Sequence, residues 1–153
     1  MNQESVVQVT HDGPVAIVEM RFAPHNLLGP TLMQGILDGF EAAEAAGARA
    51  VLLKSGLRHF SAGADLSLFE AAMGNGEGLT VSPAEFLARL ESFSLPAVAA
   101  VHGVCVGGGF ELALACDFII AARSAKIGSV EVTLGLNPLM GAIQRQVPVS
   151  YTH

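Results

Sequence analysis

The first part of the chain has the residue pattern of two β-strands. Residues Val6–Thr10 and Val15–Met20 alternate apolar and polar positions or run with β-branched side chains, and His11–Pro14 between them is typical of a turn. We therefore expect a β-hairpin. Three later apolar runs have the length of short buried strands: Ala50–Ser55, Ala97–Val101 and Phe118–Ala121.

Two capping boxes predict helices between these strands. The first, Thr31–Gln34, directly follows Pro30 and predicts a helix over residues 31–46. The second, Ser82–Glu85, has proline at the first helical position and predicts a helix over residues 83–93.

Two shorter helices are expected over Phe110–Ala115 and from Asp65 through Phe69 toward Met73. The glycine-rich stretch Gly74–Gly78 is typical of a mobile loop rather than a domain boundary. Because strands and helices alternate along the chain, the predicted fold class is α/β.

Composition narrows the possible partners. The chain has 153 residues, of which 51% are hydrophobic and 14% charged, and its mean hydropathy is +0.49. Such an apolar chain is expected to have surface that another subunit or further chain covers. The net charge of −6 and the lack of any Lys/Arg cluster argue against nucleic acid as a partner.

The cysteines and the apolar runs indicate a cytoplasmic protein. Cys105 and Cys116 lie eleven residues apart, without the spacing of a disulfide framework or a zinc site. The apolar stretch 95–122 contains Pro96, His102, Glu111 and Asp117, which leaves runs shorter than the roughly 20 residues that span a bilayer. The first residues lack the pattern of a signal peptide. We expect no metal and no membrane.

Two glycine-centred runs are the most informative motifs: F-S-A-G-A-D-L at Phe60–Leu66 and H-G-V-C-V-G-G-G-F-E-L-A at His102–Ala113. Each places small residues where a helix is expected to begin, and N–H groups at a helix start are unpaired and favour negative charge. Two such turns facing each other would hold an oxyanion. The alternative is structural, with three glycines that only allow a tight turn into a closely packed helix.

Together with A-K-I-G-S-V-E-V-T-L-G-L-N-P, these runs resemble the enoyl-CoA hydratase/isomerase (crotonase) family in order, spacing and residue type, from the first hairpin to about Arg145. The resemblance implies a crotonase-like ββα spiral that acts on an acyl-CoA thioester. It implies no cofactor, because coenzyme A is part of the substrate. A homotrimer or a dimer of trimers is expected for the full-length protein.

The resemblance also assigns roles to four residues. The backbone N–H groups of Ala64 and Gly108 match the two oxyanion donors. Glu111 matches the carboxylate that activates water for attack at C3, and Glu131 the one that exchanges the proton at C2. Hydration of a conjugated double bond needs both a base and an acid, which two carboxyl groups can supply. Burial would raise the pKa of Glu111 and a nearby helix start would lower it, and the sequence leaves that balance open.

Other residues receive weaker or structural assignments. By resemblance, a coenzyme A pocket is lined by Ala62, Ala64, Asp65, Leu66 and Ser67. We interpret Asp117 as stabilising a junction between helix and strand, His102 as a hydrogen-bonded residue at a strand end, and Cys105 as a packing residue rather than a nucleophile.

The chain departs from the family in two places. Leu139 and Met140 are bulky where many relatives have a glycine-rich turn, so we expect a reshaped acyl pocket. Residues 147–153 look like a non-native tail, which divides the chain into a crotonase-like amino-terminal part, 1–146, and that tail. The carboxy-terminal helices of the family are expected to be absent.

Four functions follow from these observations. A 2-enoyl-CoA hydratase uses both Glu111 and Glu131, whereas a Δ3,Δ2-enoyl-CoA isomerase chiefly needs one carboxylate. A hydrolase or decarboxylase of the same family comes third. From another class, the chain is a non-catalytic fragment that binds partners through its exposed core.

Overall fold

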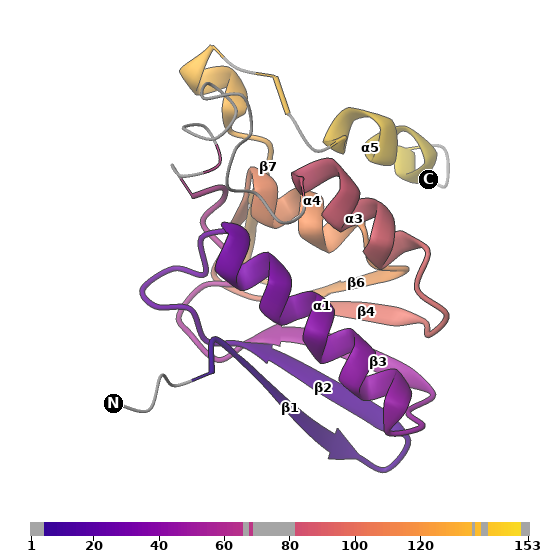
Figure 1. Cartoon of the computed structure of the whole chain (residues 1–153). Helices are drawn as coiled ribbons and strands as arrows, with labels where there is room; N and C mark the ends of the chain where they lie inside the picture. Colours follow the sequence, from indigo (N-terminus) through magenta and orange to yellow (C-terminus); the bar gives the residue numbers. More distant parts are fainter. Residues whose placement is uncertain (1–4, 66–67, 69–81, 136, 139–140, 151–153) are drawn as a thin grey trace.

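The computed structural model describes residues 5–65, 68, 82–135, 137–138 and 141–150. The described part is a mixed α/β fold (Figure 1), which confirms the predicted class. Its strands are β1 (Val7–Asp12), β2 (Val15–Met20), β3 (Ala50–Ser55), β4 (Ala97–Val101), β5 (Val104–Val106), β6 (Phe118–Ala121) and β7 (Lys126–Gly128). Its helices are α1 (Pro30–Ala45), α3 (Pro83–Glu91), α4 (Gly108–Leu114), the 3₁₀ helix η1 (Glu131–Leu134) and α5 (Ala142–Ser150).

Five strands form one sheet in the order β1-β2-β3-β4-β6. β1 and β2 are the predicted hairpin, with Asp12 opposite Val15 across a two-residue turn. The pairs β2/β3, β3/β4 and β4/β6 are parallel, as expected where helices connect successive strands. β5 and β7 form a separate parallel pair, which the sequence did not predict.

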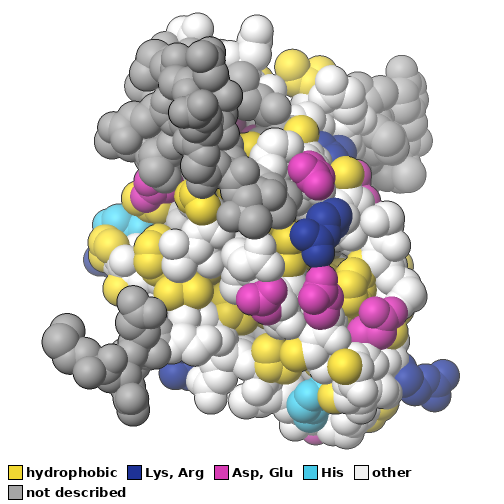
Figure 2. Space-filling model, in the orientation of Figure 1, with side chains coloured by type: hydrophobic (Ala, Val, Ile, Leu, Met, Phe, Trp, Pro, Cys, Tyr) yellow, Lys and Arg dark blue, Asp and Glu magenta, His cyan; other side chains and the backbone are white. Residues whose placement is uncertain are grey.

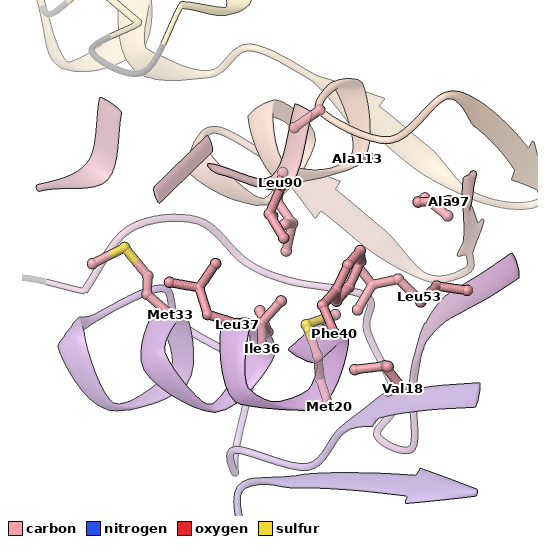
Figure 3. Packing of buried hydrophobic residues seen from close by; sticks show 14 of the residues in the cluster. Val18, Met20, Met33, Ile36, Leu37, Phe40, Leu53, Leu90, Ala97 and Ala113 are labelled. Carbon is pink, nitrogen blue, oxygen red and sulfur yellow. The ribbon is translucent and has the colours of Figure 1, made fainter. Parts of the chain in front are cut away.

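Helix α1 crosses one face of the sheet, and α3 lies beside it (Figure 1). The buried side chains of α1 recur every three or four residues, so they form one face of the helix. Figure 3 shows this face packed toward the strands, with Ile36 and Phe40 near Val18, Met20 and Leu53. This layer is the hydrophobic core.

Several helix ends differ from the prediction. α1 begins at Pro30, its N-cap is Gly29, and no side chain caps it, so the predicted capping box at Thr31 is wrong. Gln34 instead donates to Asp38 one turn further along, 2.6 Å away. The cap of α3 is confirmed, because Ser82 Oγ accepts from the N–H of Glu85 at 3.2 Å.

Two further boundaries differ slightly. α3 ends at Glu91 rather than near residue 93, and α4 begins at Gly108, two residues before the predicted start. The predicted strands over 50–55, 97–101 and 118–121 are confirmed. The predictions for residues 69–78, including the loop Gly74–Gly78, lie outside the described residues.

The last strand of the sheet is exposed. All four residues of β6 are open to solvent, and the side chains of Phe118 and Ile120 are each 66% exposed. The expected uncovered apolar surface is therefore present. On the face drawn in Figure 2, Lys and Arg side chains are scattered among acidic and apolar ones. Within the described residues, none of the helices has the length and apolar content to cross a bilayer.

Candidate active site

Backbone pairing brings the two glycine-centred runs together. The N–H of Ser61 donates to the carbonyl of Val104, and the N–H of Val106 donates to the carbonyl of Ser61, both at 3.2 Å. This short parallel bridge places the turns that follow it next to each other. A Cβ on Gly107 would lie 3.8 Å from the Cα of Gly63.

Steric constraints explain why glycine, rather than a larger residue, stands at three positions in these turns. Gly107 has φ 55° and ψ −131°, and Gly63 has φ 111°, conformations that L side chains rarely adopt. A Cβ on Gly109 would lie 2.5 Å from the Cβ of Ser61, so α4 could not approach the first turn so closely with any larger residue. The close packing proposed in the structural interpretation of the triple glycine is therefore confirmed.

Two N–H groups in these turns have no hydrogen-bond acceptor among the described residues. They belong to Ala64 and to Gly108, the first residue of α4. Their neighbours are engaged: the N–H of Asp65 donates to the carbonyl of Leu28 at 2.7 Å, and the N–H of Gly107 to that of Gly128 at 3.1 Å. Both groups can therefore donate to a ligand without losing a bond of the fold.

A buried polar network supports the first turn, and the sequence did not predict it. The side-chain amide of Asn26 donates to the carbonyl of Phe60 at 3.1 Å and to Ser55 Oγ at 2.8 Å. Ser61 Oγ donates to the backbone carbonyl of Asn26 at 2.7 Å. Asn26 is fully buried and has φ 49°. The asparagine two residues after Pro24 could have indicated this turn from the sequence, because asparagine tolerates the left-handed backbone conformation.

Glu111 lies in the first turn of α4, directly after the glycines and Phe110, and is buried. Only 2% of its surface is exposed to solvent. Its Oε1 accepts a hydrogen bond from the N–H of Ala142, the first residue of α5, at 3.0 Å. A buried carboxyl group needs such a partner, and a helix start is a favourable one for an anion.

Glu131 is the first residue of η1 and is half-buried. Its Oε1 lies 3.3 Å from the position that a Cβ on Gly107 would occupy. Its Oε2 is buried and has no hydrogen-bond partner among the described residues. The N–H of Glu111 donates to the carbonyl of Gly107 at 3.0 Å, so this glycine is bonded to the backbone of one glutamate and lies beside the carboxylate of the other.

The residues predicted to line a coenzyme A pocket are described only in part. Ala62, Ala64 and Asp65 lie consecutively around Gly63 and are each half-buried. The N–H of Ala62 donates to the carbonyl of His25 at 3.0 Å. Leu66 and Ser67 lie outside the described residues, as do Leu139 and Met140.

Three structural assignments are confirmed. Asp117 follows α4, and its carboxylate accepts from the N–H of Ala97 at the start of β4 at 2.7 Å. His102 Nε2 is hydrogen-bonded to the carbonyl of Leu57 at 2.7 Å. Burial raises the pKa of the Cys105 thiol to about 12, so it is not an activated nucleophile.

A surface cavity of about 280 Å³ lies elsewhere, between α1 and the carboxyl end of α3. It is lined mainly by polar side chains, two of which already form the ion pair between Arg89 and Glu41. None of the predicted site residues lines it.

A sequence model of the enoyl-CoA hydratase/isomerase family matches residues 10–151. A probable enoyl-CoA hydratase of Bacillus subtilis is 35% identical over 92% of this chain and 56% of its own length. The 2,3-dehydroadipyl-CoA hydratase of Escherichia coli is 37% identical over 83% of this chain and 50% of its own.

The fold is also that of solved enoyl-CoA hydratases. An enoyl-CoA hydratase subunit I from Geobacillus kaustophilus superposes with a TM-score of 0.78, at 31% identity, over 92% of this chain and 55% of the other. The expected crotonase-like fold is thereby confirmed. The chain spans about half the length of these two curated relatives.

Proposed function

Because this chain belongs to the enoyl-CoA hydratase/isomerase family, we propose that the complete protein adds water across the double bond of a 2-enoyl-CoA thioester. One observation supports this most. Two backbone N–H groups without an acceptor in the described residues, on Ala64 and Gly108, lie in adjoining turns next to two glutamates from separate elements.

In the proposed reaction, Glu111 takes a proton from water as the water oxygen attacks C3. The π electrons of the double bond move toward the thioester carbonyl, whose oxygen becomes enolate-like and is bound by the N–H groups of Ala64 and Gly108. Glu131 then donates a proton to C2, which gives 3-hydroxyacyl-CoA. Fixed dipoles directed at the developing charge and a paired acid and base account for the rate.

Binding of the substrate follows the same turn. We assign the coenzyme A part to Ala62, Ala64, Asp65, Leu66 and Ser67, largely through backbone groups. The reaction needs no metal or redox cofactor, since an enolate held by two N–H groups is its only charged intermediate. We further propose a cytoplasmic enzyme that is complete as a homotrimer or a dimer of trimers.

A second candidate function, Δ3,Δ2-enoyl-CoA isomerisation, is favoured by one observation. Oε1 of Glu111 is engaged by Ala142, whereas Oε2 of Glu131 is buried without a partner among the described residues. A single glutamate with an open oxygen suits proton transfer between two carbons of one substrate.

Isotope labelling separates the two functions. In H₂¹⁸O, a hydratase acting on crotonyl-CoA incorporates ¹⁸O at C3, whereas an isomerase acting on a 3-enoyl-CoA forms the conjugated thioester without incorporating oxygen. We expect the label at C3 with the complete protein, and an unchanged rate in the control Glu41→Gln, which alters an exposed residue of α1. Isomerisation without labelling would replace the hydratase proposal.

A further inference from the structure

Helix α5 is joined to the site and to α3 within a single turn. At its start, the N–H of Ala142 donates to Oε1 of Glu111 at 3.0 Å. Three residues later, the guanidinium of Arg145 binds both carboxylate oxygens of Glu91, the last residue of α3, through Nε to Oε1 and through Nη2 to Oε2 at 2.8 Å. Figure 1 shows α5 next to α3 and α4, which carry these two glutamates.

The side chain of Arg145 lies close to the backbone at the start of α5. Gly141 has φ 95°, and a Cβ at that position would collide with the Arg145 guanidinium. The N–H of Arg145 donates to the carbonyl of Gly141 at 3.2 Å. The arginine therefore folds back over the first turn of its own helix, and its side chain is only 19% exposed.

The charge of Arg145 also acts on Glu111. The pKa of Arg145 is raised chiefly by its hydrogen bond to Glu91, then by the charge of Glu91 and by that of Glu111. By reciprocity, the positive charge of Arg145 stabilises the ionised form of Glu111.

The same turn reaches the region of the second glutamate. Nε2 of Gln146 donates to Oγ of Ser129 at 3.2 Å, and Ser129 precedes Glu131 by two residues. α5 is thus attached to the elements that carry both proposed catalytic groups. A shift of this helix would move the N–H that binds Glu111.

We propose that Arg145, held by Glu91, is a positioning residue that fixes α5 so that the N–H of Ala142 keeps Glu111 ionised and correctly oriented as the base. The role of Glu111 as a base rests on the proposed function. The orientation and charge of Glu111 can be measured without any substrate. Arg145 itself does not contact the reacting atoms.

Among the described residues, three other titratable groups of the neighbouring elements supply no positive charge that could stabilise ionised Glu111. Glu131 of η1 carries no positive charge in either protonation state. The thiol of Cys105 on β5 is neutral, with its pKa raised to about 12, and its Sγ contacts the carbonyl of Gly109. Asp117, after α4, is hydrogen-bonded to Ala97. Arg145 is therefore the cation that we expect to set the charge of Glu111.

The test is the titration of Glu111 in the complete protein, followed by ¹³C NMR of its carboxyl carbon and assigned with Glu111→Gln. We expect Arg145→Gln to raise the pKa of Glu111 by about one unit. In Arg145→Lys the pKa of Glu111 should stay close to that of the wild-type protein, since lysine keeps the positive charge. Ala142→Pro should also raise the pKa, because it removes the N–H at a helical position where proline is tolerated.

A matched control is Arg89→Gln, which breaks the comparable ion pair with Glu41 on the surface of α3 and α1. It should leave the pKa of Glu111 unchanged. In kinetic assays, Arg145→Gln should lower kcat more than it changes KM and move the acid limb of the pH profile upward, because the base must be ionised.

An unchanged pKa of Glu111 in Arg145→Gln, with the fold intact by circular dichroism, would overturn the positioning role. A shift as large in Arg89→Gln would do the same, since it would show a general loss of stability. If the shift occurs as expected but the wild-type protein has no hydratase activity, the positioning inference stands and the proposed function fails.

Discussion

Two regions of the chain differ sharply in how they are packed. The covered region, residues 7–55, contains β1, β2, β3 and α1, and many of its apolar side chains are buried between helix and sheet. The open region, residues 118–146, contains β6, β7, η1 and the first turn of α5, and carries large apolar side chains at the surface.

The comparison separates stability from chemistry. The covered region supplies the rigid sheet, whereas both proposed catalytic glutamates depend on the open region, Glu131 directly and Glu111 through Ala142. Groups placed by elements with little buried surface are held by hydrogen bonds and ion pairs rather than by a core. Their geometry should therefore be more sensitive to substitution than the sheet of the covered region.

The largest difference is expected from a pair of phenylalanine substitutions. Phe40 is fully buried on α1 and stacks edge-on against Phe93 at 5.3 Å, so Phe40→Ala should lower the free energy of unfolding by about 3–5 kcal/mol. Phe118→Ala on β6 should change it by less than about 0.5 kcal/mol. Urea unfolding followed by circular dichroism measures both, and equal losses would mean that β6 is as well packed as α1.

A backbone change tests the turn at the start of α4, which lies between the two regions in the sequence. In the complete protein, Gly108→Pro removes one proposed oxyanion donor and should lower kcat by on the order of 100-fold. Gly108→Ala keeps the N–H and is the matched control for the loss of glycine. If both variants fold and bind coenzyme A but Gly108→Pro hydrates crotonyl-CoA at the normal rate, Gly108 is not a donor.

The exposed surface of the open region should make the 153-residue chain self-associate. Replacing Phe118 and Ile120, each 66% exposed, by lysine should reduce light scattering without changing secondary structure. The matched control replaces two exposed polar residues of the covered region, Gln8 and Thr10, in the same way. A monodisperse wild-type monomer would show that this surface causes no association.

The smallest effect concerns pH and the covered region. Hydrogen bonding to Lys54, at 2.7 Å, is the main cause that lowers the pKa of Glu19, with Arg21 contributing. Because the folded state has the lower pKa, this stabilisation is present above the pKa of the unfolded chain and is lost as the pH falls through that of the folded protein. Glu19→Gln should remove at most about 1 kcal/mol at neutral pH and flatten the acid side of the stability profile.

The sequence predicted correctly those features that depend only on residues close together in the chain. The hairpin, the strand Ala50–Ser55 and the Ser82 cap depend on neighbouring residues, and all three are confirmed. The start of α1 was misplaced because Thr31 matches a cap by type, while proline is best tolerated at the first helical position.

Contacts between distant segments could not be predicted in the same way. β5 and β7 have three residues each, too few for a recognisable pattern, and they form only because they pair with each other. The partners of the site glutamates are likewise distant in sequence, since Ala142 lies 31 residues from Glu111. Glycine motifs indicated the turns, but the supporting role of Asn26 and of α5 needed the structure.

The most direct test of the two-glutamate mechanism is a double-mutant cycle in the complete enzyme. Glu111→Gln and Glu131→Gln keep the shape of each side chain but prevent proton transfer, so each should slow hydration of crotonyl-CoA by roughly 100- to 10,000-fold. If the two act as one unit, the double variant should be scarcely slower than either single one. Normal hydration in Glu111→Gln, with activity lost only in Glu131→Gln, would contradict the mechanism and support a single-base isomerase.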